Sequence, residues 1–156
     1  MDIGTDKNDE IFMKRALALS LQGTGYVRPN PLVGAVIVRD GQIIGEGYHE
    51  KFGGPHAEIN ALNKCILKGG ANGGTIYVTL EPCSFYGKTP PCTDALIKSG
   101  IRKVVCAMTD PNPLVSGSGF KKLEEAGISV VNGVLENDAK IINEEYIKFI
   151  TTQNKG

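Results

Sequence analysis

The sequence predicts an α/β protein, a three-layer α/β/α sandwich around a five-stranded mixed sheet. An Asp-Gly pair joins two strand-like runs, and three further apolar runs are separated by segments with helical spacing. The Asp-Gly pair predicts an antiparallel hairpin, and alternating β and α units extend such a sheet with parallel strands. With 156 residues, the chain is expected to be one domain over residues 1–156, with about 1–8 frayed.

Apolar spacing and turn residues place the individual elements. Helices are predicted over 9–21, 56–68, 92–99, 117–126 and 138–150. Strands are predicted over 32–38, 42–49, 75–80, 103–108 and 128–131. Asn8 or Asp9 can cap the first helix, and Pro55 suits the first position of the second. Gly69, Gly100 and Gly127 are typical helix stops.

Composition excludes several classes of function. Seventeen basic residues balance seventeen acidic ones, so no basic excess indicates a nucleic-acid partner. The longest uncharged runs, 16–27 and 69–80, are too short to span a bilayer, and the polar N-terminus is no signal peptide. We therefore expect a cytoplasmic protein with no membrane and no nucleic-acid contact.

Two cysteines flank a Gly- and Pro-containing loop in TLEPCSFYGKTPPC (79–92). In a reducing compartment, close cysteines are more often metal ligands or catalysts than disulfides. His56, Cys83 and Cys92 offer one imidazole and two thiolates, a set that suits Zn²⁺ and leaves one tetrahedral position open for water. In α/β sheets, ligands gather where strands end, which is where this stretch begins.

Glu58 is the predicted general base. It lies two residues after His56, in the first turn of a predicted helix. Residues at i and i+2 do not share a helix side, but both can point beyond the helix tip toward one site. A helix N-terminus also favours thiolates and developing negative charge.

The pattern H-A-E, then P-C and a second cysteine, resembles that of the zinc deaminases. Eight residues separate the two cysteines, and in this the chain resembles one branch of those enzymes, the deaminase domain of bacterial and plant riboflavin-biosynthesis proteins. The resemblance implies a cytidine deaminase-like fold. The matching segments, within roughly 11–150, are PNPLVGAVIV (29–38), GEGYH (45–49), PHAE (55–58), TLEPCSFYGKTPPC (79–92) and DPNPLVSGSG (110–119).

This resemblance implies a reaction and a set of substrate contacts. The family hydrolyses the 2-amino group of 2,5-diamino-6-ribosylamino-4(3H)-pyrimidinone 5′-phosphate, giving 5-amino-6-ribosylaminouracil 5′-phosphate and ammonia. Zinc activates the water, and Glu58 takes the water proton, protonates the ring nitrogen and then helps ammonia to leave. The implied substrate-binding residues are Asn30, His49, Ala57, Phe85, Lys88, Asp110 and Asn112.

The resemblance also implies partners. Family members form dimers or tetramers, so a homo-oligomer is expected. The deaminase is usually joined to a reductase, which this chain is expected to lack, so the reductase is a separate or a fused partner. Phe85 stands where the family usually has histidine, so a stacking ring replaces a hydrogen-bonding one.

Other interpretations stay open at this point. Cys83 and Cys92 could be ordinary packing residues, as Cys65 and Cys106 are expected to be. The zinc could be structural, in a non-catalytic subunit that partners a reductase. The chain could also be a zinc deaminase of another nucleobase, a nucleotide or tRNA. A general base beside the metal favours catalysis over a structural role.

Overall fold

The computed structural model describes residues 7–84 and 90–153. The helices are α1 (Lys7–Ser20), α2 (Ala57–Cys65), α3 (Cys92–Ser99), α4 (Ser118–Glu125), α5 (Glu136–Ile142) and α6 (Glu144–Gln153). Single 3₁₀ turns, η1 (Leu21–Gly23) and η2 (Ile66–Lys68), extend α1 and α2. The strands are β1 (Gly34–Arg39), β2 (Gln42–Tyr48), β3 (Thr75–Val78), β4 (Lys103–Cys106) and β5 (Ser129–Asn132).

The strands form one mixed sheet in the order β2-β1-β3-β4-β5. Strand β1 pairs antiparallel with both β2 and β3, whereas β3, β4 and β5 are parallel. The β1–β2 hairpin turns at Asp40 and Gly41, whose φ values of 53° and 77° are those that a two-residue Asp-Gly turn requires. The predicted five-stranded mixed sheet is confirmed.

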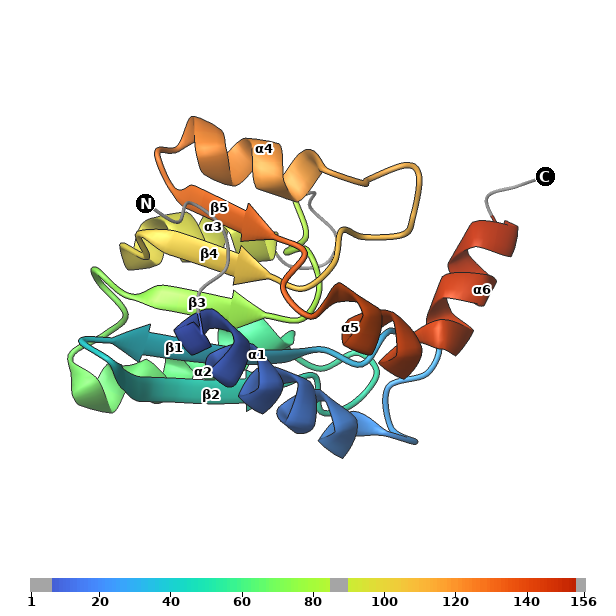
Figure 1. Cartoon of the computed structure of the whole chain (residues 1–156), viewed down its shortest axis with the longest axis horizontal. Helices are drawn as coiled ribbons and strands as arrows, with labels where there is room; N and C mark the ends of the chain where they lie inside the picture. The colour runs from blue at the N-terminus through green and yellow to red at the C-terminus, as the bar shows by residue number, and fades with distance from the viewer. Residues whose placement is uncertain (1–6, 85–89, 154–156) are drawn as a thin grey trace.

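Helices cover both faces of the sheet (Figure 1). On one face, Ala61 of α2, Leu96 of α3 and Leu123 of α4 pack against alternate side chains of the strands. On the other face, Met13 of α1 and Ala139 of α5 pack against the remaining strand side chains. Because successive strand residues point to opposite faces, the two cores are separate and the architecture is the predicted three-layer sandwich.

The first two helix starts differ from the sequence prediction. Helix α1 begins at Lys7, so residues 7 and 8 are helical, and Asp9 is no cap but a buried side chain that accepts a hydrogen bond from Tyr77 Oη at 2.9 Å. Helix α2 begins at Ala57 with His56 as its N-cap residue, so Pro55 precedes the helix.

A single terminal helix over 138–150 is a wrong prediction. The chain forms two helices that meet at Asn143, which is buried. The Asn143 side chain accepts a hydrogen bond from Leu32 N and donates one to Leu32 O, both at 2.8 Å. These bonds hold the junction against the segment before β1, so α6 leaves the body in a new direction (Figure 1).

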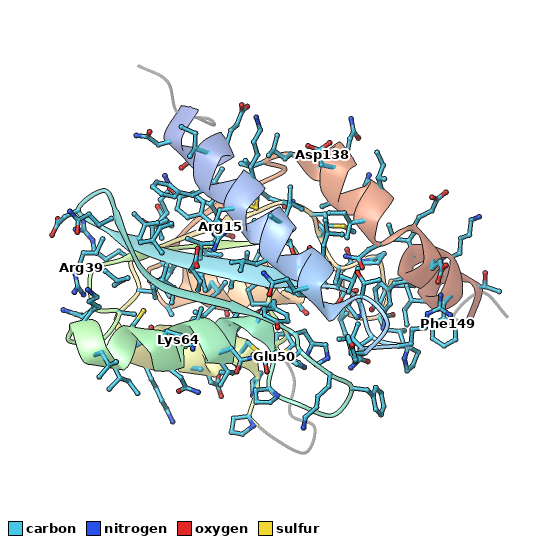
Figure 2. All side chains as sticks on the ribbon, turned by 90° about the horizontal axis from the view of Figure 1, so that it is seen from below. Arg15, Arg39, Glu50, Lys64, Asp138 and Phe149 are labelled. Carbon is cyan, nitrogen blue, oxygen red and sulfur yellow. The ribbon has the colours of Figure 1, made fainter. Side chains whose placement is uncertain are left out.

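The hairpin and helix α6 lie at opposite ends of the molecule (Figure 1). Figure 2 labels Arg39 at one end and Phe149 of α6 at the other. The Arg39 guanidinium donates hydrogen bonds to the carbonyls of Lys68, Gly70 and Asn72, which closes the hairpin end. Within residues 7–84 and 90–153, no helix has the length and apolar character needed to cross a membrane.

Helix α1 approaches β1 so closely that Gly34 has no room for a side chain. A Cβ at this position would lie 1.9 Å from Ala16 O and 2.9 Å from Ser20 N. Gly34→Ala is therefore expected to lower the free energy of unfolding by about 3 kcal/mol or more. Urea denaturation measures this, with Gly54→Ala as the control because its nearest atoms lie 3.2 Å away. Equal losses in both variants would contradict the packing described.

Candidate metal centre and active site

A cavity of about 230 Å³ lies where β3 ends and α2 begins. It is lined by Asn30, Pro31, Val33, His49, His56, Ala57, Glu58, Leu80, Glu81, Cys83, Asp110 and Tyr146. It lies at the end of the parallel strands, where α/β proteins bind their ligands.

Three nitrogen and sulfur donors meet at this cavity. His56 comes from the N-terminus of α2, Cys83 from the segment after β3, and Cys92 from the first residue of α3. His56 Nδ1 lies 3.2 Å from Cys92 Sγ and 3.9 Å from Cys83 Sγ, and all three atoms lie within 4.8 Å of one another. Tetrahedral zinc separates such ligand atoms by about 3.5–3.8 Å, so the donor set fits a zinc ion.

Helix geometry explains why Cys83 can act as a thiolate. The first N–H groups of a helix have no partner within the helix. At α3, Cys92 N–H donates to Cys83 Sγ at 3.1 Å, and Thr93 N–H donates to Cys83 O at 3.1 Å. Hydrogen bonds from Cys92 and His56 hold the pKa of the Cys83 thiol at about 4, although burial opposes them. The pKa of Cys92 is raised, first by its bond to Cys83 and then by burial.

Glu58 lies in the first turn of α2 and is buried, with 4% of its surface exposed. Burial raises the pKa of its carboxyl to about 7, the His56 imidazole opposes this shift, and the Cys83 thiolate adds to it. The carboxylate also contacts the Cys92 thiol. One ionisable carboxyl therefore lies against the three candidate ligands and faces the cavity.

A chain of hydrogen bonds fixes one wall of the cavity. His49 Nδ1 lies 3.1 Å from the Pro55 carbonyl, so this nitrogen carries the proton and donates. His49 Nε2 then accepts from the Asn30 amide at 3.1 Å. Burial, more than any other effect, lowers the pKa of His49, which keeps the imidazole neutral in this tautomer.

Glu81 also lines the cavity, and its role was not identified from the sequence. This buried carboxylate follows β3 and accepts four backbone N–H bonds from one loop and the start of α4. The donors are Asp110 and Gly117 to Oε1, at 2.9 and 3.0 Å, and Gly119 and Phe120 to Oε2, at 2.8 and 3.4 Å. The loop that carries Asp110 is thereby tied to the residue two places before Cys83.

Glu81→Gln is expected to lower the free energy of unfolding by about 2 kcal/mol, because the amide nitrogen of Gln would face backbone donors in place of an acceptor. Thermal or urea unfolding measures the loss. Glu125→Gln is the matched control, since Glu125 is exposed and such surface changes usually stay within about 0.5 kcal/mol. Equal stability of the two variants would show that the Glu81 bonds contribute nothing.

The structure gathers most of the residues named from the sequence. Asn30, His49, His56, Ala57, Glu58, Cys83 and Asp110 line the cavity, and Cys92 completes the donor set. Asn112 does not line it: its N–H donates to Asp110 Oδ1 at 2.9 Å, and its own Oδ1 accepts from Leu114 N at 3.0 Å, which shapes the loop. Phe85 and Lys88 lie outside the described residues. Cys65 and Cys106 are buried in the core, as predicted.

The fold and the donor set together define a zinc-binding deaminase domain. Residues 6–108 match the sequence model of the family described as the cytidine and deoxycytidylate deaminase zinc-binding region. The chain belongs to this family.

Its relatives place it more narrowly, among the riboflavin-biosynthesis deaminases. It is 54% identical over 145 residues to the riboflavin biosynthesis protein RibD of Aquifex aeolicus, covering 93% of this chain and 40% of that protein. It is 52% identical to a diaminohydroxyphosphoribosylamino-pyrimidine deaminase of Buchnera aphidicola, covering 93% of this chain and 97% of the relative. The chain thus spans about two fifths of the longer relative and nearly all of the shorter one.

A solved structure shows the same fold. The diaminohydroxyphosphoribosylaminopyrimidine deaminase/5-amino-6-(5-phosphoribosylamino)uracil reductase of Thermotoga maritima superposes with a TM-score of 0.89 at 52% identity. The match covers 94% of this chain and 42% of that one. The fold of the present chain therefore corresponds to part of a longer protein in that organism.

Proposed function

We propose that this chain hydrolyses the 2-amino group of 2,5-diamino-6-ribosylamino-4(3H)-pyrimidinone 5′-phosphate, releasing ammonia and 5-amino-6-ribosylaminouracil 5′-phosphate. The observation that carries the proposal is the buried Glu58 carboxylate beside the His56, Cys83 and Cys92 donors in one cavity. The high identity to a Buchnera protein with this deaminase name, over almost its whole length, supports the choice of substrate.

His56, Cys83 and Cys92 would hold a zinc ion, which would lower the pKa of a bound water molecule towards neutrality. Glu58 takes one proton of that water and delivers it to the ring nitrogen beside the amino-bearing carbon, and it then transfers the remaining hydroxyl proton from the added oxygen to the departing amino group. The bond from carbon to the water oxygen forms, the bond from carbon to nitrogen breaks, and ammonia leaves. A single carboxylate can serve all three transfers because it borders the cavity from the tip of α2.

The cavity walls would orient the pyrimidinone. Hydrogen bonds to Asn30 and to the Pro55 carbonyl fix the neutral His49 ring in one orientation. This part of the cavity wall therefore presents one arrangement of donors and acceptors. Asp110, which lines the same cavity, adds a carboxylate whose pKa is raised mainly by burial. Substrate binding by Asn30, His49, Ala57 and Asp110 is part of this proposal, as are the contacts of Phe85, Lys88 and Asn112 that the family resemblance implies.

A structural zinc subunit is the second candidate. Among the described residues, the donor group at the cavity holds three ligands, which leaves one tetrahedral position open, whereas a structural zinc takes four protein ligands. This favours catalysis. A partner reductase is also proposed, supported by the two activities in the name of the Thermotoga protein. A homo-oligomer is proposed from the family resemblance alone.

The experiment is ammonia release by the zinc-loaded protein, offered the diaminopyrimidinone ribosyl phosphate, with cytidine and guanine as alternative substrates. The proposal predicts turnover of the first compound alone. Turnover of cytidine or guanine instead would assign another deaminase substrate, and zinc binding without any turnover would favour the structural subunit.

A further inference from the structure

We propose that Tyr146 of α6 is a specificity-determining residue of the deaminase pocket, and that its hydroxyl donates a hydrogen bond to an oxygen of the bound substrate. In the sequence, Tyr146 falls within the predicted terminal helix over 138–150, with no role in the site. The inference rests on the proposed function and adds a contact from the last helix to it.

Tyr146 lies where two cavities adjoin. It lines the 230 Å³ cavity that contains His56, Glu58 and Cys83. It also lines a neighbouring cavity of about 470 Å³ between the 24–32 segment and α6. Asn30 is the other residue that the two linings share. A substrate larger than a single ring, with its amino group at the metal centre, has to extend past these two side chains.

Two sets of contacts hold Tyr146 in this place. The Asn143 side chain makes two hydrogen bonds to the Leu32 backbone, at the junction of α5 and α6. Arg28 donates to Glu145 at 2.5 Å, joining α6 to the same segment. Tyr146 lies in the first turn of α6, directly after this junction, and it lines both cavities together with Asn30 of the same segment. The helix end is therefore fixed on the cavity side although α6 projects from the body (Figure 1).

The Tyr146 hydroxyl is available as a donor. Within residues 7–84 and 90–153 it makes no hydrogen bond, although the ring is half-buried. Burial, together with the charge of the Asp110 carboxylate, raises the pKa of the phenol to about 12. The group therefore stays protonated at neutral pH and offers one O–H, whereas Asp110 offers only acceptors when it is ionised. The two side chains thus present a donor and an acceptor to one ligand.

The test compares Tyr146→Phe with Tyr26→Phe in the zinc-loaded protein. Tyr26 is 69% exposed and lines neither cavity, so its variant removes the same atom outside the site. Tyr146→Phe is expected to raise KM for the ribosyl phosphate substrate about tenfold and to change kcat by less than about twofold. The Kd of the ribosylaminouracil phosphate product, measured by calorimetry, should rise by a similar factor. Tyr26→Phe should change none of these values.

An unchanged KM and product Kd in Tyr146→Phe would overturn the inference. So would a loss of thermal stability with unchanged KM, because that result is what a purely structural side chain gives. If the wild-type protein neither turns over this substrate nor binds the product, the proposed function itself fails, and the role of Tyr146 fails with it. If the wild-type protein is active and Tyr146→Phe has the same KM and product Kd, only the proposed role of Tyr146 is rejected.

Discussion

Replacing Glu58 by Gln is expected to lower kcat for ammonia release by a factor of about 10²–10⁴ while zinc stays bound, because Gln keeps the shape of the side chain but cannot accept or return a proton. Ammonia release and metal analysis on the same preparation measure the two quantities.

Glu50→Gln is the matched control for that variant. Glu50 is exposed in the loop after β2, as Figure 2 shows, and lines neither cavity near the metal centre. Its kcat is expected to equal that of the wild type. A Glu58→Gln enzyme with kcat within about threefold of the wild type would remove Glu58 from the proton transfers.

Loss of a metal ligand is expected to have the second large effect. Cys92→Ala removes one of three candidate donors and leaves Cys83 without its neighbouring thiol. Zinc affinity should fall by more than about a hundredfold, since loss of a residue that merely supports a ligand costs about 10–100-fold. Activity should fall with zinc content. Competition with a chromophoric chelator measures the affinity.

Cys65→Ala separates metal loss from core damage. Cys65 is as buried as Cys92 but packs in the core between α2 and the sheet, away from the donor set. It is expected to lose stability and to retain zinc. If Cys92→Ala binds zinc as tightly as Cys65→Ala does, the assignment of Cys92 as a ligand is wrong.

The sequence predicted the parts of this protein whose causes are local. Asp40-Gly41 between two strand-like runs predicted the hairpin. The positive φ values of both residues confirm that the chain turns there because Asp and Gly tolerate this conformation. Gly69 and Gly100 end η2 and α3 in the left-handed conformation that favours glycine. The three donors were predicted because zinc chemistry needs particular residue types, and the fold brings them within 4.8 Å.

The features that the sequence did not predict depend on contacts between distant segments. The break between α5 and α6 comes from two bonds to Leu32, more than a hundred residues earlier, and no local signal marks Asn143 as different from a helical Asn. Glu81 has its donors in the 110–120 segment, so its role is visible only in the folded chain. A charged residue directly after a buried strand, before Pro-Cys, was the available signal for Glu81.

The most direct test of the account is ammonia release measured during zinc titration. The purified protein is stripped of metal with a chelator, zinc is added back in steps, and the rate with the diaminopyrimidinone ribosyl phosphate is followed. The rate should be near zero without metal, rise in proportion to bound zinc, and reach a plateau at about one zinc per chain. A rate that does not depend on bound zinc, or no ammonia from this substrate at full zinc loading, would contradict it.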